Sequence, residues 1–199
     1  MDGLNGISDE RLFERYRRGD SNSLRTLIER HHEDLLRFLT RLVGDRSAAE
    51  DVFQETFLQI HLSAESFDAS RRFRPWLFTI AANKGRDYLR KRGRQQSMEV
   101  SAPVGGDGER PSIVDLMEMD TPSPDAAMDE RERDSLVQRA LSGLSPTMRE
   151  ILLLAYFQRL SYAQMAEDLQ IPLGTVKSRL HAAVAAFAKR WHEVSHEGE

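Results

Sequence analysis

The sequence of 199 residues contains no cysteine. Disulfide bonds and thiolate metal sites are therefore excluded, and the composition fits a reducing compartment. No stretch approaches the roughly 20 apolar residues that a membrane-spanning helix needs. The first 20 residues are polar and charged, unlike a secretory signal peptide. We therefore expect a cytoplasmic protein with no direct membrane insertion.

Sequence features of enzymes are also missing. The chain has no Gly-rich phosphate-binding loop and no nucleophile elbow. His31 and His32 are adjacent, so they point to different sides of a helix, and neither is part of a His-x-x-x-His pair. The sequence therefore predicts a protein that is not an enzyme and has no catalytic residues, no metal site and no cofactor.

Apolar residues recur at helical spacing through most of the chain, and no alternating strand pattern is present. The N-terminal half predicts helices over residues 9–18, 21–43, 47–62 and 75–92, with a loop over 63–74. Ser47 and Glu50 have the spacing of a capping box for the third helix, and Pro75 suits the first turn of the fourth. Four further helices are predicted over residues 132–141, 147–157, 162–169 and 172–191. The fold class is therefore all-α.

The composition changes between the two sets of helices. Residues 93–129 are rich in glycine, proline and acids, and residues 107–134 hold ten acidic against three basic residues. This predicts a flexible acidic linker over residues 94–131 that joins two small helical domains, residues 8–93 and 132–192. The linker either keeps the chain soluble or mimics nucleic acid, and neutralising Asp115, Glu118 and Asp120 distinguishes the two.

A basic segment with interleaved aromatic residues lies in the N-terminal half. Residues 71–94 contain nine basic residues and one acid, although the net charge of the whole chain is −4. Cations bind phosphates, and aromatic and amide groups stack on an extruded base or form hydrogen bonds with it. We expect the cations to bind DNA, and we expect Phe73 and Trp76 to be core residues.

Residues 161–180 have the spacing of a helix-turn-helix. Ser161 is expected to cap the first helix, and Ala166 is small enough for a close helix crossing. Leu169 and Ile171 are expected to pack in the angle between the two helices. Pro172 is expected to start the second helix, which places Ile171 at its N-cap.

The second helix of this motif is amphipathic. The residues expected on its buried stripe are Leu173, Val176, Leu180, Val184 and Phe187. Those expected on the opposite face are Thr175, Ser178 and Ala182, flanked by Lys177, Arg179 and His181. Such a helix can enter a major groove, and the alternative is a helical hairpin with a solvated face.

Taken together, these segments resemble the sigma-70 family, specifically its small extracytoplasmic-function group, which keeps two domains called regions 2 and 4. Residues 49–57 resemble the part that grips a coiled coil on the polymerase clamp. Residues 67–89 resemble the part that melts and recognises the −10 element. Residues 144–151 and 174–179 resemble region 4, which recognises the −35 element. Ala182 departs from the family, which often has a basic residue there.

The resemblance implies an alternative sigma factor that directs promoter-specific transcription initiation. It implies three partners: core RNA polymerase through its clamp coiled coil, promoter DNA, and an anti-sigma factor. The implied residues for polymerase binding form an i, i+3, i+4, i+7 stripe: Asp51, Gln54, Glu55 and Leu58. Those for the −35 element are Thr175, Lys177, Ser178, Arg179 and His181. Those for the −10 element are Phe67, Asp68, Arg71, Arg72, Arg74, Asn83, Lys84, Arg86 and Arg90.

The resemblance also implies that Phe67 and Asn83 share a pocket that captures a flipped −10 base. Two other classes of protein are alternatives. A stand-alone helix-turn-helix regulator would bind DNA without core polymerase, which a polymerase pull-down tests. An interaction protein that binds an anti-sigma factor or adaptor would not initiate transcription, which a run-off assay tests.

Overall fold

The computed structural model describes residues 6–68, 70–96, 130–158 and 160–196, and within these residues the regular elements are all helices. They are α1 (Asp9–Arg17), α2 (Ser21–Val43), α3 (Arg46–Leu62), the short 3₁₀ helix η1 (Ala64–Ser66), α4 (Phe73–Gln96), α6 (Glu130–Ser142), α7 (Pro146–Gln158), α8 (Tyr162–Leu169) and α9 (Leu173–His196). The all-α prediction is confirmed. None of these helices is both long and apolar enough to cross a membrane.

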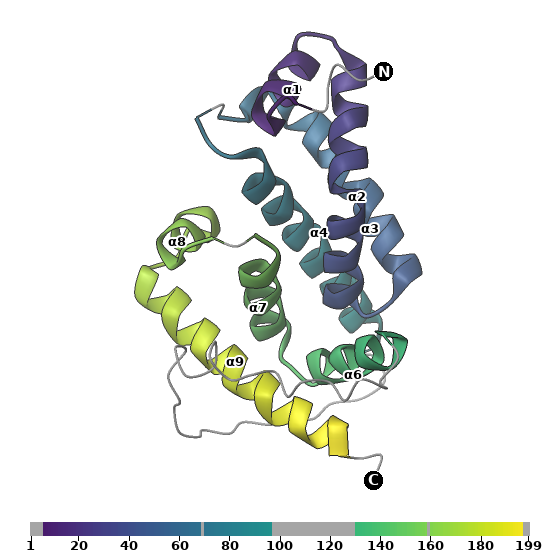
Figure 1. The fold of residues 1–199 in the computed structure, drawn as a ribbon, viewed down its shortest axis with the longest axis vertical. Coiled ribbons are helices and arrows are strands. Elements are labelled where there is room, and N and C mark those ends of the chain that lie inside the picture. Colours follow the sequence, from purple (N-terminus) through teal and green to yellow (C-terminus); the bar gives the residue numbers. More distant parts are fainter. Residues whose placement is uncertain (1–5, 69, 97–129, 159, 197–199) are drawn as a thin grey trace. The chain divides into compact units, whose positions relative to one another are not determined.

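The chain divides into two compact units, the first containing α1 to α4 and the second containing α6, α8, α9 and most of α7 (Figure 1). Most of the predicted linker, including Asp115, Glu118 and Asp120, lies outside the described residues. At its borders, α4 continues three residues past Gly93, and α6 begins at Glu130.

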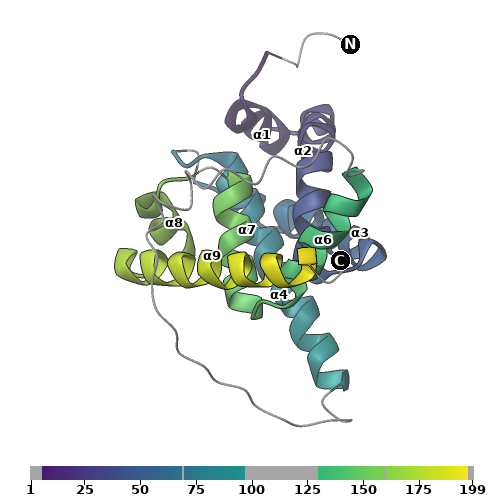
Figure 2. The same ribbon diagram turned by 60° about the horizontal axis from the view of Figure 1, so that its bottom comes forward.

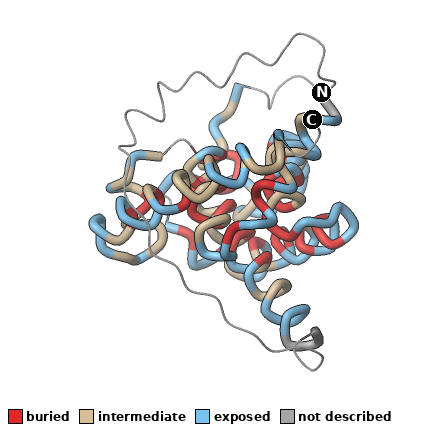
Figure 3. The backbone as a smooth tube through the Cα atoms, turned by 90° about the horizontal axis from the view of Figure 1, so that it is seen from below, coloured by how far each residue is buried: buried red, intermediate tan, exposed pale blue. Residues whose placement is uncertain are grey.

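The first unit is held by apolar stripes on α2 and its neighbours. Leu27, Leu35 and Leu39 are fully buried, as the spacing predicted. Buried positions recur along the helices of this unit (red in Figure 3). Burying a leucine side chain contributes about 1.5–3 kcal/mol, so this stripe fixes which face of α2 points inward. Gly85 lets α4 approach α2 closely, because a Cβ there would lie 2.6 Å from Leu42 Cδ2.

Local signals set several helix boundaries. Gly44 ends α2 in the left-handed conformation, with φ of 86°. The predicted Ser47 cap of α3 is wrong. Asp45 is the N-cap, and its Oδ1 accepts from the Ala48 N–H at 2.8 Å, so the turn from α2 into α3 is shorter than expected. Asp accepts from these free N–H groups as well as Ser does.

The second unit is built around the long helix α9, with α8 near its start and α6 near its end (Figures 1 and 2). Arg149 on α7 ties the α6–α7 hairpin together. Its guanidinium donates to the carbonyl oxygens of Leu141 at 2.9 Å, Ser142 at 3.1 Å and Leu144 at 3.3 Å. These carbonyls lie at and after the end of α6, where the helix leaves carbonyl groups without its own hydrogen bonds, and Leu141 also accepts from the Leu144 N–H at 3.1 Å. Burial lowers the pKa of Arg149.

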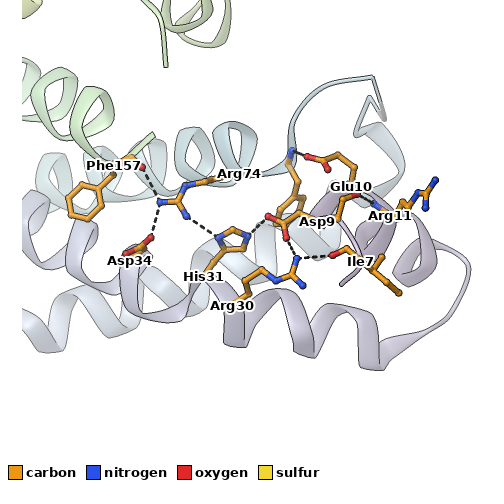
Figure 4. Close-up of polar contacts among 11 residues, drawn as sticks. Ile7, Asp9, Glu10, Arg11, Arg30, His31, Asp34, Arg74 and Phe157 are labelled. Atoms are coloured by element: carbon orange, nitrogen blue, oxygen red, sulfur yellow. Dashed lines mark hydrogen bonds and ion pairs between the residues drawn. The ribbon is translucent and has the colours of Figure 1, made fainter. Parts of the chain in front are cut away.

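A polar network joins α1 to α2 (Figure 4). The Asp9 carboxylate accepts from Arg30 and from His31 Nε2 at 2.7 Å, and Arg30 also donates to the Ile7 carbonyl at 3.0 Å. Burial by itself raises the pKa of Asp9, but the hydrogen bonds and charges of His31 and Arg30 outweigh it, so the pKa lies below the ordinary 3.8. Asp9 therefore stabilises the fold as a carboxylate.

Replacing Asp9 with Asn should lower the free energy of unfolding by about 1.5–3 kcal/mol at neutral pH, because two charge-assisted hydrogen bonds are lost. Because the folded pKa is depressed, this contribution is complete above pH 3.8 and disappears as the pH falls through the folded value. Urea unfolding of the variant and the wild type across this range measures it. Glu14→Gln on the same helix is the control. An Asp9→Asn variant as stable as the wild type would contradict the assignment.

Candidate nucleic-acid and partner surfaces

The predicted stripe on α3 lies at the surface. Asp51, Gln54, Glu55 and Leu58 are all exposed, with Leu58 at 58%. Within the described part of the chain, neither carboxylate forms an ion pair, whereas neighbouring Glu50 accepts from Arg46 at 3.2 Å. The stripe therefore offers two carboxylates with no described ion-pair partner, an amide and an apolar side chain to another molecule.

Leu62 extends this stripe by one turn and was missed from the sequence. It is 69% exposed and lies four residues after Leu58, on the same face of α3. A pair of exposed leucines at this spacing is an apolar contact surface beside the acids. The signal was available in the sequence, because Leu62 continues the i, i+4 series beyond the buried Ile60.

The loop before α4 is shaped by Asp68. Its carboxylate accepts from the Ser70 N–H at 2.9 Å and the Ser70 hydroxyl at 2.7 Å, and its carbonyl accepts from the Arg71 N–H at 2.9 Å. The Ser70 hydrogen bonds lower the pKa of Asp68. Asp68 therefore folds the turn that presents Arg71 and Arg72, which are both exposed.

Phe67 lies inside an aromatic cluster. Its ring contacts those of Phe13 at 5.1 Å, Phe73 at 6.2 Å and Trp76 at 4.6 Å, and the residue is 6% exposed. The expectation that Phe73 is a core residue is confirmed, because it is fully buried. The Phe67 ring is thus closed to a base in this structure, and stacking on it would require a neighbouring ring to move.

The exposed face of α4 carries the amide and several cations. Asn83, Arg86 and Arg90 are exposed at i, i+3 and i+7, and Lys84 is half-buried to one side. Trp76 lies on the same face, seven residues before Asn83. Trp76 is half-buried against the rings of Phe13, Phe67 and Phe73, so the expectation that it is a core residue holds only in part.

Arg74 is half-buried, whereas Arg71 and Arg72 are exposed. Its guanidinium pairs with Asp34 at 2.9 Å, lies 4.8 Å from the Phe78 ring centre and approaches His31 Nδ1 at 3.4 Å (Figure 4). These contacts hold Arg74 against its own domain, so it is less available to a phosphate than Arg71 or Arg72.

The helix-turn-helix is formed by α8 and α9. Ser161 caps α8, and Gln164 completes a capping box. Gln170 makes the turn in the left-handed conformation, with φ of 56°. The predicted start of the second helix is wrong by one residue: α9 begins at Leu173. Pro172 therefore holds the N-cap position assigned to Ile171, and its carbonyl accepts from the Val176 N–H at 3.1 Å.

The predicted inner stripe of α9 is fully buried only at Val176 and Leu180. Leu173 is 41% exposed, because it stands at the first position of the helix, and Val184 and Phe187 are half-buried. Ala183, which was not predicted, is buried instead. The outward side presents Lys177, Ser178, Arg179 and Ala182, which are all exposed, and Thr175, which is half-buried. This is the arrangement of a helix that can contact base edges and phosphates.

His181 is placed differently from its neighbours on α9. The residue is half-buried, and its Nε2 is buried without a hydrogen-bond partner among the described residues. That nitrogen is therefore turned away from any DNA on the outward side.

A histidine pair near the end of α9 was also missed from the sequence. His192 and His196 lie one turn apart, with ring centres separated by 4.3 Å, and Glu193 follows the first as in a zinc-protease helix. The Glu193 carboxylate accepts from Arg190 at 2.9 Å. The described residues contain no group of three potential metal ligands. Two side chains alone fall short of a zinc site.

Family models match both units of the chain. The model of sigma-70 region 2 matches residues 27–95, and the model of sigma-70 region 4 matches residues 134–187. Among curated proteins, the RNA polymerase sigma-H factor of Pseudomonas aeruginosa is 32% identical, over 91% of this chain and 92% of its own length. The ECF RNA polymerase sigma factor SigL of Mycobacterium tuberculosis is 38% identical, over 82% of this chain and 86% of its own length.

A solved structure shares the fold. The sigma factor RpoE of Bartonella quintana, crystallised with the anti-sigma factor NepR, has a TM-score of 0.57 and 25% identity. The match covers 85% of this chain and 96% of that one. Two helical units, the second with a helix-turn-helix, define a DNA-binding protein of transcription. This chain belongs to the sigma-70 family, in its extracytoplasmic-function (ECF) group of alternative sigma factors, which direct transcription initiation.

Proposed function

We propose that three surfaces of the chain bind three different partners during transcription initiation. The α3 stripe, residues Asp51 to Leu58 with Leu62, binds core RNA polymerase at the clamp coiled coil. The outward side of α9 binds the −35 duplex. The loop over residues 67–72 and the exposed face of α4 bind the −10 strand. The observation that carries this assignment is the order of the two family matches, each of which contains its expected surface.

The proposed domain bounds are residues 8–93 for region 2, 94–131 for the linker and 132–192 for region 4. We assign no catalytic role to the chain, because polymerase supplies the chemistry and its metal ions. Since the chain acts on polymerase, we assign it to the cytoplasm. These assignments rest on the family to which the chain belongs.

An anti-sigma factor is the third proposed partner. It is supported by the RpoE relative, whose solved structure contains one. Co-purification from the source bacterium, with and without the inducing signal, tests this proposal. An anti-sigma factor should leave the chain when promoters become active.

Reconstituted transcription tests the proposed function directly. When the chain is added to core polymerase, run-off transcripts should appear. The free chain, without core polymerase, should bind the same promoters only weakly. A stand-alone regulator would bind the same DNA equally well without core enzyme and would not start transcripts. A pull-down of core polymerase by the wild-type chain separates these two outcomes before any promoter is known.

Arg179 should distinguish base recognition from phosphate binding on α9. Replacing Arg179 with Ala should cost about 1–3 kcal/mol on the matching −35 sequence if the guanidinium contacts a base edge. Binding to duplexes with single −35 substitutions measures this. A uniform loss across all duplexes would make Arg179 a phosphate contact, and no loss on any would remove it from the surface. Lys189→Ala, an exposed cation farther along α9, is the control.

A further inference from the structure

Neither the first turn of α4 nor Arg72 before it has a side chain suited to cap the helix. The turn contains no acid, and arginines stand at positions 71, 72 and 74 around it. A helix N-terminus carries free N–H groups and partial positive charge, so neighbouring cations make it unfavourable. The residue before the helix, Arg72, has no side-chain acceptor to offer. The start of α4 therefore needs an acceptor from elsewhere in the fold.

Glu10 supplies that acceptor from α1. Its Oε1 accepts from the Phe73 N–H at 3.0 Å, across 63 positions of sequence. A carboxylate at a helix N-terminus is stabilising both as a hydrogen-bond acceptor and as a negative charge. Glu10 thus satisfies the first N–H of α4 at the point where the loop over residues 67–72 enters the helix.

α1 is held in place for this contact on both sides of Glu10. Asp9 joins α1 to Arg30 and His31 of α2 (Figure 4). Phe13, one turn after Glu10, is fully buried, and its ring lies 5.1 Å from Phe67 and 5.0 Å from Phe73. The same short helix therefore holds both ends of the loop over residues 67–72, through ring packing at Phe67 and through the Glu10 cap at Phe73.

We propose that Glu10 is a positioning residue for recognition of the −10 strand. It acts through α4 and the loop over residues 67–72 and does not contact DNA. The region 2 match begins at residue 27, so it assigns no part of this role to α1. The proposal rests on the proposed function, in which this loop and the exposed face of α4 bind the −10 strand.

The test uses holoenzyme reconstituted from the full chain and core polymerase. The probe is a fluorescent single strand with the −10 sequence of an identified promoter, together with its single-base variants. The measured quantity is the ratio of Kd values between variant and matching strands. Glu10→Ala should reduce this ratio about tenfold, with affinity for core polymerase and for the −35 duplex within about twofold of the wild type. Each tenfold corresponds to about 1.4 kcal/mol.

Two further variants sharpen the test. Glu10→Gln keeps an amide oxygen that can accept from the Phe73 N–H, so it should restore most of the discrimination. Glu14→Ala, one turn along α1, removes an exposed carboxylate that pairs with Arg18 and should leave discrimination unchanged. A Glu10→Ala variant with wild-type discrimination would overturn the proposal. A wild-type holoenzyme that shows no −10 base preference would instead overturn the proposed function of the loop.

Amide hydrogen exchange separates positioning from general stability. In Glu10→Ala, exchange should accelerate at Phe73 and in the loop over residues 67–72, while amides of α2 and α3 keep their protection. Acceleration spread equally over α2 and α3 would show Glu10 to be a general stabiliser of the domain and would overturn its assignment as a positioning residue.

Discussion

Replacing Asp51, Gln54 and Glu55 together with Ala should abolish binding to core RNA polymerase and leave the helical fold intact. All three side chains are exposed, and Ala is the strongest helix former, so α3 should persist. Losing one partner of a desolvated charge pair costs about 2–5 kcal/mol. Two lost carboxylates would therefore weaken binding by about 4 kcal/mol or more, which is about a thousandfold in Kd.

Fluorescence anisotropy of labelled chain with core polymerase measures this loss, and circular dichroism checks the fold. The matched control is Glu29→Ala with Glu33→Ala on α2. These are also exposed acids, but each pairs within its own helix, with Arg25 and Arg37. The control should bind core polymerase normally. Wild-type affinity in the α3 triple variant would move the polymerase surface elsewhere on the chain.

Strand opening should depend on Asn83. With Asn83→Ala, holoenzyme should open duplex promoters about tenfold less well, because an amide that bonds the edge of a flipped base is worth about 1.4 kcal/mol in a dry pocket. Binding to core polymerase and to the −35 duplex should be spared. Permanganate footprinting of the −10 region measures opening, and a pre-melted promoter bubble should rescue much of the defect.

Phe67→Ala should impair opening as well, but its defect has two sources. Phe67 is buried against three rings, and truncating a buried phenylalanine costs about 3–5 kcal/mol of stability. Asn83 is exposed, so its variant tests base capture without that cost. Asn22→Ala, an exposed amide in the first turn of α2, is the control. Normal opening and unchanged −10 base preference in folded Asn83→Ala would remove Asn83 from the −10 site.

Features that depend only on neighbouring residues could be predicted from the sequence. α2 spans the predicted residues 21–43, because its leucine stripe and Gly44 are local signals. α8 spans the predicted residues 162–169, because the Ser161 capping box lies within four residues of chain. The exposure of the α3 stripe and the outward side of α9 followed from the same helical period. The family resemblance rested on two such local segments in the right order.

Features that join distant segments of the chain could not be predicted and depend on how the helices pack. His31 completes the buried stripe of α2 because Asp9, 22 residues earlier, satisfies its Nε2. Phe67 is buried because Phe13 of α1 and Trp76 of α4 close around its ring. The Phe73 N–H at the start of α4 donates to Glu10, 63 residues away. Helical periodicity specifies which face of a helix is apolar. It does not predict which other helix will supply a hydrogen-bond partner or an aromatic contact. Those partners become neighbours only when the helices pack.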